Sequence, residues 1–263
     1  AMAYQGETIH AVPFVDLAPR QANCPHQRFP TQFSVAQRNF AHLAQTNNIN
    51  CAYNRHKWNP MVAPSSRCTV CNSGQIESTS HVLNACTPRL ICYKRRHDAA
   101  LNVLAKFLTK KFPSHTVLVD AVAPRDVSPC ALRPDFQIFP NSGAGRVFII
   151  DVKIPFPKEG FVERTHNDNV AKYTTLAARY SEKYQCEVPI LTIIIPSVGP
   201  NIKFTCDQFR RMGFIEREFN RVMSNMSAQV ARKNFALTRT LPKTHVPGLP
   251  LAVAALPALA TNE

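Results

Sequence analysis

The sequence has no long hydrophobic run, no secretory leader and no even set of cysteines. Its longest apolar stretches, residues 188–196 and 249–260, fall short of the roughly 20 residues that a membrane-spanning helix needs. Nine cysteines without a leader argue against a disulfide framework. We therefore expect no membrane partner, a reducing compartment, and cysteines that serve as thiols or metal ligands.

Acidic residues are also scarce. Lys and Arg number 31 against 17 Asp and Glu, which gives the 263-residue chain a formal net charge of +14. Residues 131–195 are nearly neutral, with 8 basic and 7 acidic residues, so the basic excess lies in the flanking segments. This imbalance predicts an anionic partner, most often a nucleic acid.

Four residues with metal-ligand chemistry occur close together in the pattern C-x2-C-x9-H-x4-C: Cys68, Cys71, His81 and Cys86. A Cys-x2-Cys turn presents two thiolates to one tetrahedral ion, so the pattern predicts a closed structural zinc site. We expect Thr79 or Ser80 to cap a short helix that carries His81 and ends before Cys86. Cys92 is a rival ligand, whereas Cys24 and His26 are more simply explained as part of a loop.

Two strand-like segments, residues 131–139 and 147–154, surround a turn at residues 140–145 and predict a β-hairpin. Such a hairpin brings Asp135 and Asp151 together at one end, where a hard cation such as Mg²⁺ relieves their repulsion. Lys153 shares a strand face with Asp151 and can orient an attacking water or stabilise charge on a phosphate oxygen. The alternative is an exposed hairpin with solvated charges.

The elements around this hairpin follow a recognisable order. Periodicity predicts a helix over residues 94–112, a strand over 116–122, the hairpin, a helix over 168–184 and a strand over 187–195. One or two helices follow over residues 207–236, divided at Gly213, and a helix over 31–47 precedes a loop over 48–66. The helix from residue 94 carries basic residues that can hold a nucleic-acid backbone, unless they form an ordinary solvated face: Arg95, Arg96, Lys106 and Lys110.

Together these motifs resemble the C-terminal restriction-like endonuclease region, of the PD-(D/E)xK type, in polyproteins of site-specific non-LTR retrotransposons. Such elements include those that insert into ribosomal RNA genes. The resemblance covers roughly residues 40–240. It depends on the CCHC set together with four short motifs: Arg96-His97-Asp98, Arg133-Pro134-Asp135, Asp151-Val152-Lys153 and Lys172-Tyr173.

The resemblance implies an α/β fold: an αβββαβ restriction-endonuclease-like core with an N-terminal zinc knuckle and extra C-terminal helices. It divides the chain into an arm and linker helix (1–66), a CCHC knuckle (67–92), an endonuclease domain (93–240) and a disordered tail (241–263). Asp135 and Asp151 would bind Mg²⁺, and the catalytic residues would be these two with Lys153 and Lys172. Accessory roles would fall to Arg133, Tyr173 and His97.

The activity implied is nicking of double-stranded target DNA in the nucleus. The nick leaves a 3′-hydroxyl that primes reverse transcription of the element RNA by a reverse-transcriptase domain upstream in the same polyprotein. The alternative is a zinc-knuckle module that binds DNA or RNA without cutting it. The intact D…D-x-K pattern favours the nuclease.

Overall fold

The computed structural model describes residues 33–71, 73–124, 127, 131–142, 145–199 and 202–239. These residues form a mixed α/β fold built on a four-stranded mixed sheet. The expectations for the N-terminal arm, for Cys24 and His26, and for the tail from residue 241 lie outside the described residues. None of the described helices is long and apolar enough to cross a membrane.

The sheet has the strand order β1-β2-β3-β4. The strands are β1 (His115–Val119), β2 (Phe136–Pro140), β3 (Phe148–Lys153) and β4 (Ile190–Ile194). The predicted hairpin is confirmed, because β2 and β3 pair antiparallel with Phe136 opposite Ile150. By contrast, β4 runs parallel to β3, and this pairing requires the long crossover connection that the intervening helix supplies.

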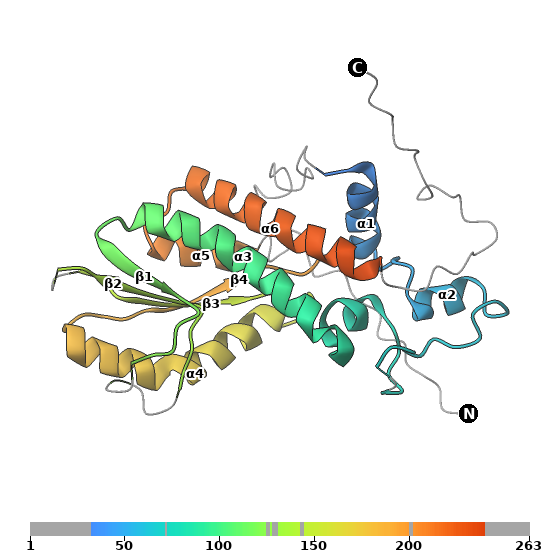
Figure 1. Ribbon diagram of the computed structural model, residues 1–263, viewed down its shortest axis with the longest axis horizontal. Coiled ribbons are helices and arrows are strands. Elements are labelled where there is room, and N and C mark those ends of the chain that lie inside the picture. Colours follow the sequence, from blue (N-terminus) through green and yellow to red (C-terminus); the bar gives the residue numbers. More distant parts are fainter. Residues whose placement is uncertain are drawn as a thin grey trace, which may run out of the picture.

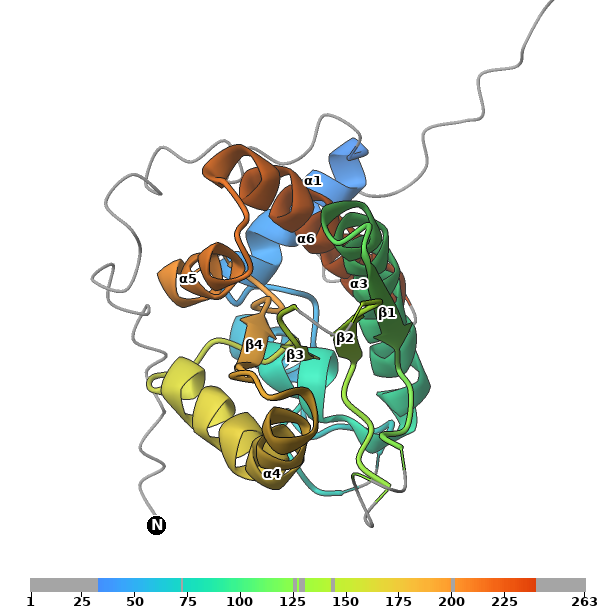
Figure 2. The ribbon, with the colours of Figure 1, turned by 90° about the vertical axis from the view of Figure 1, so that its left-hand side faces the viewer.

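Helices cover both faces of the sheet, as Figures 1 and 2 show. On one face lie α3 (Leu90–Lys111), α5 (Lys203–Arg211) and α6 (Glu216–Thr238), and on the other lies α4 (Phe161–Tyr184). Gly213, with φ +81°, separates α5 from α6 as predicted. From α3 onward the order is helix, three strands, helix, strand. α3 and α4 both start earlier than predicted, and the expected domain boundary at residues 92 and 93 falls inside α3.

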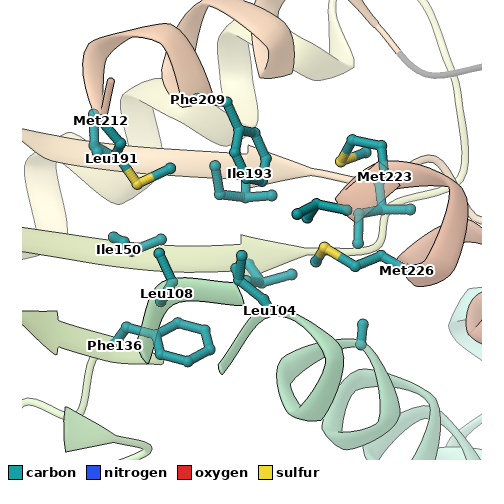
Figure 3. Close-up of a cluster of buried hydrophobic side chains, with 14 of the residues drawn as sticks. Leu104, Leu108, Phe136, Ile150, Leu191, Ile193, Phe209, Met212, Met223 and Met226 are labelled. Atoms are coloured by element: carbon teal, nitrogen blue, oxygen red, sulfur yellow. The ribbon is translucent and has the colours of Figure 1, made fainter. Parts of the chain in front are cut away.

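The main core lies between the sheet and the α3, α5 and α6 layer. Successive side chains of a strand point to opposite faces, so Ile150 joins this core while Ile149 faces the α4 layer. Figure 3 shows the residues that close the core from α3, the strands, the α5 region and α6: Leu104, Leu108, Phe136, Leu191, Ile193, Phe209, Met212, Met223 and Met226. By the same alternation, Asp151 and Lys153 lie on the α4 side of β3.

Four short helical elements precede α3 in the described residues. They are α1 (Val35–Gln45), α2 (Ala52–Trp58), the π-helix η4 (His81–Ala85) and the 3-10 turn η5 (Thr87–Arg89). Phe40 of α1 stacks on Phe235 of α6 with ring centroids 5.8 Å apart, and Val82 and Leu83 of η4 join the same buried cluster. The segment over residues 48–66 was predicted to be a loop, but it contains the short helix α2. The seven residues of α2 are too few to show helical periodicity in the sequence.

Candidate functional site

The four predicted ligands of the knuckle converge on one point. Their ligand atoms all lie within 4.8 Å of one another. Cys68 Sγ lies 3.9 Å from Cys86 Sγ, and Cys71 Sγ lies 3.5 Å from His81 Nε2. Tetrahedral Zn²⁺ with normal bonds to sulfur and nitrogen separates its ligand atoms by about 3.5–3.8 Å. The cluster can therefore bind a metal such as zinc.

Local backbone structure builds this cluster. Cys68 N–H donates to Gln75 O at 2.9 Å, which folds the Cys-x2-Cys turn back on itself. The π-helix η4 carries His81, and Cys86 directly after it is extended (φ −77°, ψ 108°), so the helix ends before Cys86 as predicted. The cap differs from the expectation: Ser78 Oγ, not a side-chain oxygen of Thr79 or Ser80, accepts from His81 N–H at 3.2 Å.

The chemistry of these residues suits a bound cation. Burial, together with the neighbouring Cys68, raises the pKa of Cys86 to about 11, so its thiol stays protonated at neutral pH unless a metal stabilises the thiolate. The rival ligand Cys92 lies in α3, where it packs against the cluster around Val82 and Leu83. Within the described part of the chain, Cys92 is not a member of the metal-ligand group.

Asp151 is the most buried carboxylate of the hairpin motif, with 2% of its surface exposed. Tyr173 of α4 donates its hydroxyl to Asp151 Oδ1 at 2.8 Å. Burial and the Asp151 charge raise the pKa of Tyr173, so this hydroxyl stays protonated and remains a donor. Asp151 Oδ2 forms an ion pair with Lys153 Nζ, but it accepts no hydrogen bond from any described residue. This buried oxygen therefore already faces one cationic group, the Lys153 ammonium.

Asp135, immediately before β2, reaches across to the backbone of β3. Its Oδ2 accepts from Val152 N–H at 2.6 Å, which places the carboxylate beside the residue that follows Asp151. His97 Nε2 lies 3.2 Å from this same oxygen and 3.0 Å from Val152 O. Because both neighbours are acceptors, Nε2 carries the proton. Burial lowers the pKa of His97, but its hydrogen bond to Asp135 and the Asp135 charge outweigh this effect and raise the pKa overall.

The remaining motif residues lie around this pair of carboxylates. Arg133 forms an ion pair with Asp120 at 2.7 Å, and both side chains are about half exposed. The Arg133 carbonyl lies 3.4 Å from the Tyr173 hydroxyl. Lys172 is exposed, with its Nζ 4.6 Å from the centroid of the Tyr173 ring. Lys172 therefore borders the site through Tyr173 rather than through either aspartate.

The predicted basic residues of α3 divide into two groups. Arg95, Lys106 and Lys110 are exposed. Lys106 and Lys110 follow Arg95 by about three and four helical turns, so all three lie along one side of the helix. Arg96 is only 4% exposed; its Nη1 donates to Leu83 O at 2.8 Å and to Asn234 Oδ1 at 2.7 Å. Arg96 continues the inward row of the helix at four-residue spacing, so it does not lie with the other three on the exposed side of α3.

Sequence reasoning missed one polar residue at this site. Asn84 of η4 donates from Nδ2 to Ile154 O at 2.7 Å, directly after Lys153 at the end of β3. The only signal in the sequence is a single amide within the otherwise apolar run that separates His81 from Cys86.

Comparison with known proteins adds no family. No protein-family profile matches this sequence, and no curated protein shows a significant match to it. Any functional assignment of this chain therefore depends on the geometry described above.

Proposed function

We propose that this chain is a Mg²⁺-dependent endodeoxyribonuclease of the PD-(D/E)xK type, from the C-terminal region of a non-LTR retrotransposon polyprotein. One observation carries the proposal. The Asp135 carboxylate hydrogen-bonds the β3 backbone one residue after Asp151, so two carboxylates and Lys153 gather at one end of the hairpin. The order of α3, β1, β2, β3, α4 and β4 is that expected of a restriction-endonuclease-like core.

The donor set at this end of the hairpin fits Mg²⁺. Asp135 and Asp151 would hold the ion, and the Lys153 ammonium beside Asp151 Oδ2 would then turn towards the substrate phosphate. Mg²⁺ prefers a coordination shell with few protein carboxylates, in which waters and a substrate phosphate supply the other ligands. When bound, Mg²⁺ would neutralise charge that develops on the scissile phosphate.

The neighbouring side chains have separate tasks in this proposal. Lys153 would orient the attacking water and stabilise charge on a phosphate oxygen. Tyr173 fixes Asp151 through Oδ1, and Oδ2 lies on the side of Lys153. His97 holds Asp135 against β3. Lys172, exposed beside Tyr173, would meet a phosphate of the bound strand.

The proposed nuclease function also implies binding partners. The substrate would be double-stranded target DNA in the nucleus, held through its phosphates by the exposed side of α3 that carries Arg95, Lys106 and Lys110. The 3′-hydroxyl at the nick would prime reverse transcription of the element RNA by an upstream domain of the same polyprotein. Zinc in the cluster around Cys68 would be structural.

A plasmid-nicking assay tests the proposal. The zinc-loaded chain should convert supercoiled plasmid to the nicked form with Mg²⁺ but not with EDTA. Asp151→Asn should abolish nicking and leave DNA affinity, measured by fluorescence anisotropy, nearly unchanged. Lys153→Ala should slow nicking by about 10²-fold, as expected for the loss of one preorganised electrostatic group. Asp207→Asn is the matched control, because this half-exposed acid has one ion-pair partner among the described residues, Arg210 on the same helix.

Two results would redirect the assignment. Nicking by Asp151→Asn at the wild-type rate would show that the site is misassigned. Tight DNA binding with no nicking by the wild-type chain would instead favour the alternative, a zinc-knuckle module that binds nucleic acid without cutting it.

A further inference from the structure

The strand that carries Asp151 and Lys153 extends past its neighbour in the sheet. β2 pairs with β3 only from Phe148 to Ile150, whereas β4 accompanies β3 as far as Lys153. Ile195 N–H then donates to Lys153 O at 2.9 Å on the β4 side. The backbone groups of Val152 and Ile154 point to the opposite side, where the described part of β2 offers no backbone partner. Buried backbone groups of this kind need other partners.

Three side chains take the place of the missing strand. Asp135 Oδ2 accepts from Val152 N–H, and His97 Nε2 donates to Val152 O. Asn84 Nδ2 donates to Ile154 O. These side chains come from the residue before β2, from α3 and from η4, so residues outside the sheet fix this edge of β3. Asp151 and Lys153 lie directly beside the backbone groups that these three side chains bind.

Asn84 connects this edge to the metal-ligand cluster. It belongs to η4, the short π-helix that starts at His81 and is followed by Cys86, and both flanking residues are cluster members. The Asn84 Oδ1 atom is buried and accepts no hydrogen bond within the described residues, so the donor Nδ2 is the group in use. A buried amide oxygen without a donor costs free energy, so the Nδ2 hydrogen bond is what offsets the burial of this side chain.

Two contacts keep η4 rigid between the cluster and the core. Tyr93 of α3 donates its hydroxyl to Val82 O at 2.8 Å, and Arg96 donates to Leu83 O at 2.8 Å. Movement of His81 or Cys86 would therefore shift Asn84 against Ile154 rather than dissipate within a flexible loop.

We infer that Asn84 is a positioning residue through which metal binding at the cysteine–histidine cluster sets the position of Asp151 and Lys153. With metal bound, both ends of η4 are fixed and Asn84 holds the edge of β3. Without metal, His81 and Cys86 are released, and the Asn84 hydrogen bond loosens. The catalytic consequence rests on the proposed nuclease function, whereas the structural coupling does not.

Hydrogen exchange measured by mass spectrometry or NMR tests the coupling without any substrate. In the zinc-loaded chain, Asn84→Asp keeps the side-chain shape but removes the donor. Amides of residues 152–154 should then exchange about fivefold faster, the effect of losing roughly one net hydrogen bond. Asn54→Asp is the matched control: Asn54 Nδ2 also donates to backbone carbonyls, those of Asn47 and Ile49, but it lies far from β3 in the chain. It should leave exchange at residues 152–154 unchanged.

Removal of zinc completes the test as a two-by-two cycle. A chelator should accelerate exchange at residues 152–154 in the wild-type chain by a similar factor. In Asn84→Asp it should add nothing further there, because the link is already broken. Equal exchange in wild type and Asn84→Asp, or fully additive effects of the two changes, would overturn the inference. If Asn84→Asp does not fold, the chelator experiment on wild type still decides, since unchanged exchange at residues 152–154 refutes the coupling.

Nicking assays separate this inference from the proposed function. If wild type nicks DNA, Asn84→Asp should lower kcat about fivefold with little change in the KM for DNA, and restoring the donor with Asn84→Gln should recover part of the loss. An unchanged kcat would count against the catalytic part of the inference. If wild type does not nick but exchange follows the predicted cycle, the coupling stands and only the nuclease assignment fails.

Discussion

Replacement of Arg96 tests whether this residue holds the fold together or holds nucleic acid. Its guanidinium is buried without a carboxylate partner among the described residues, and its Cζ lies 5.2 Å from the centroid of the Tyr93 ring. Burial lowers the pKa of Arg96 to about 10, so the group remains charged at neutral pH. The charge is stabilised by the hydrogen bonds to Leu83 O and Asn234 Oδ1.

The expected magnitude follows from these contacts. Each hydrogen bond from a charged donor contributes about 1.5–3 kcal/mol, so Arg96→Ala should destabilise the fold by roughly 3–5 kcal/mol. Arg96→Met keeps the packing of the aliphatic stem and removes a buried charge, so it should cost about half as much. The control is Arg95→Met: this exposed neighbour on the same helix should change stability by less than about 0.5 kcal/mol.

Two assays distinguish the roles. Urea denaturation of the zinc-loaded chain gives the free energy of unfolding, and DNA affinity as a function of salt counts phosphate contacts. Arg95→Met should flatten the log–log salt slope by about 0.9, whereas Arg96→Met should leave it unchanged. An Arg96→Met protein of wild-type stability with a flattened slope would refute the structural role and return Arg96 to the DNA-binding surface.

Three further predictions follow. Elemental analysis should find about one zinc ion per chain, and Cys68→Ser should lose it and abolish the protection of residues 68–86 from hydrogen exchange. Replacing Arg95, Lys106 and Lys110 together with Gln should flatten the salt slope by up to about three units and weaken binding to all sequences alike; an unchanged slope would show that these residues are merely solvated. The Glu218 carboxylate pairs with Lys111 at 2.9 Å and accepts from Ile215 N–H, which lowers its pKa below 4.5. Its contribution is present above that value and lost as pH falls through the lowered pKa, so Glu218→Gln should cost under about 1 kcal/mol at pH 7 and reduce acid sensitivity, as acid titration of unfolding would measure.

Features set by neighbouring residues were predicted best. The hairpin follows from two β-rich segments around a turn, and the cysteine–histidine cluster follows from ligand spacing that short loops can close. The inward side of α4 follows from spacing alone, since Tyr173, Ala177 and Tyr180 are buried at intervals of four and three residues. In each case the pattern lies within one element or two adjacent ones, where geometry leaves few alternatives.

The start of α3 was not predictable in the same way. The helix begins at Leu90, but Leu90 and Ile91 are 59% and 55% exposed, so apolar residues at its start do not mark its inward side. Arg96 takes an inward position because Asn234 and Leu83, from other elements, accept its hydrogen bonds. From sequence alone a charged residue is predicted to be exposed, because the distant groups that could accept its hydrogen bonds in the core are not known.

The end of β3 that extends past β2 is the feature that the sequence predicted least well. Its partners Asp135, His97 and Asn84 lie 17, 55 and 70 residues from the backbone groups that they contact. Only Asp135 belongs to the hairpin whose pattern identified the site. The others come from α3 and η4, and α3 runs through the boundary that the sequence drew between knuckle and core. Because the knuckle supplies a hydrogen bond to the strand that carries Asp151, metal binding and the geometry of the carboxylates belong to one cooperative unit, and a variant in either should be assayed in both.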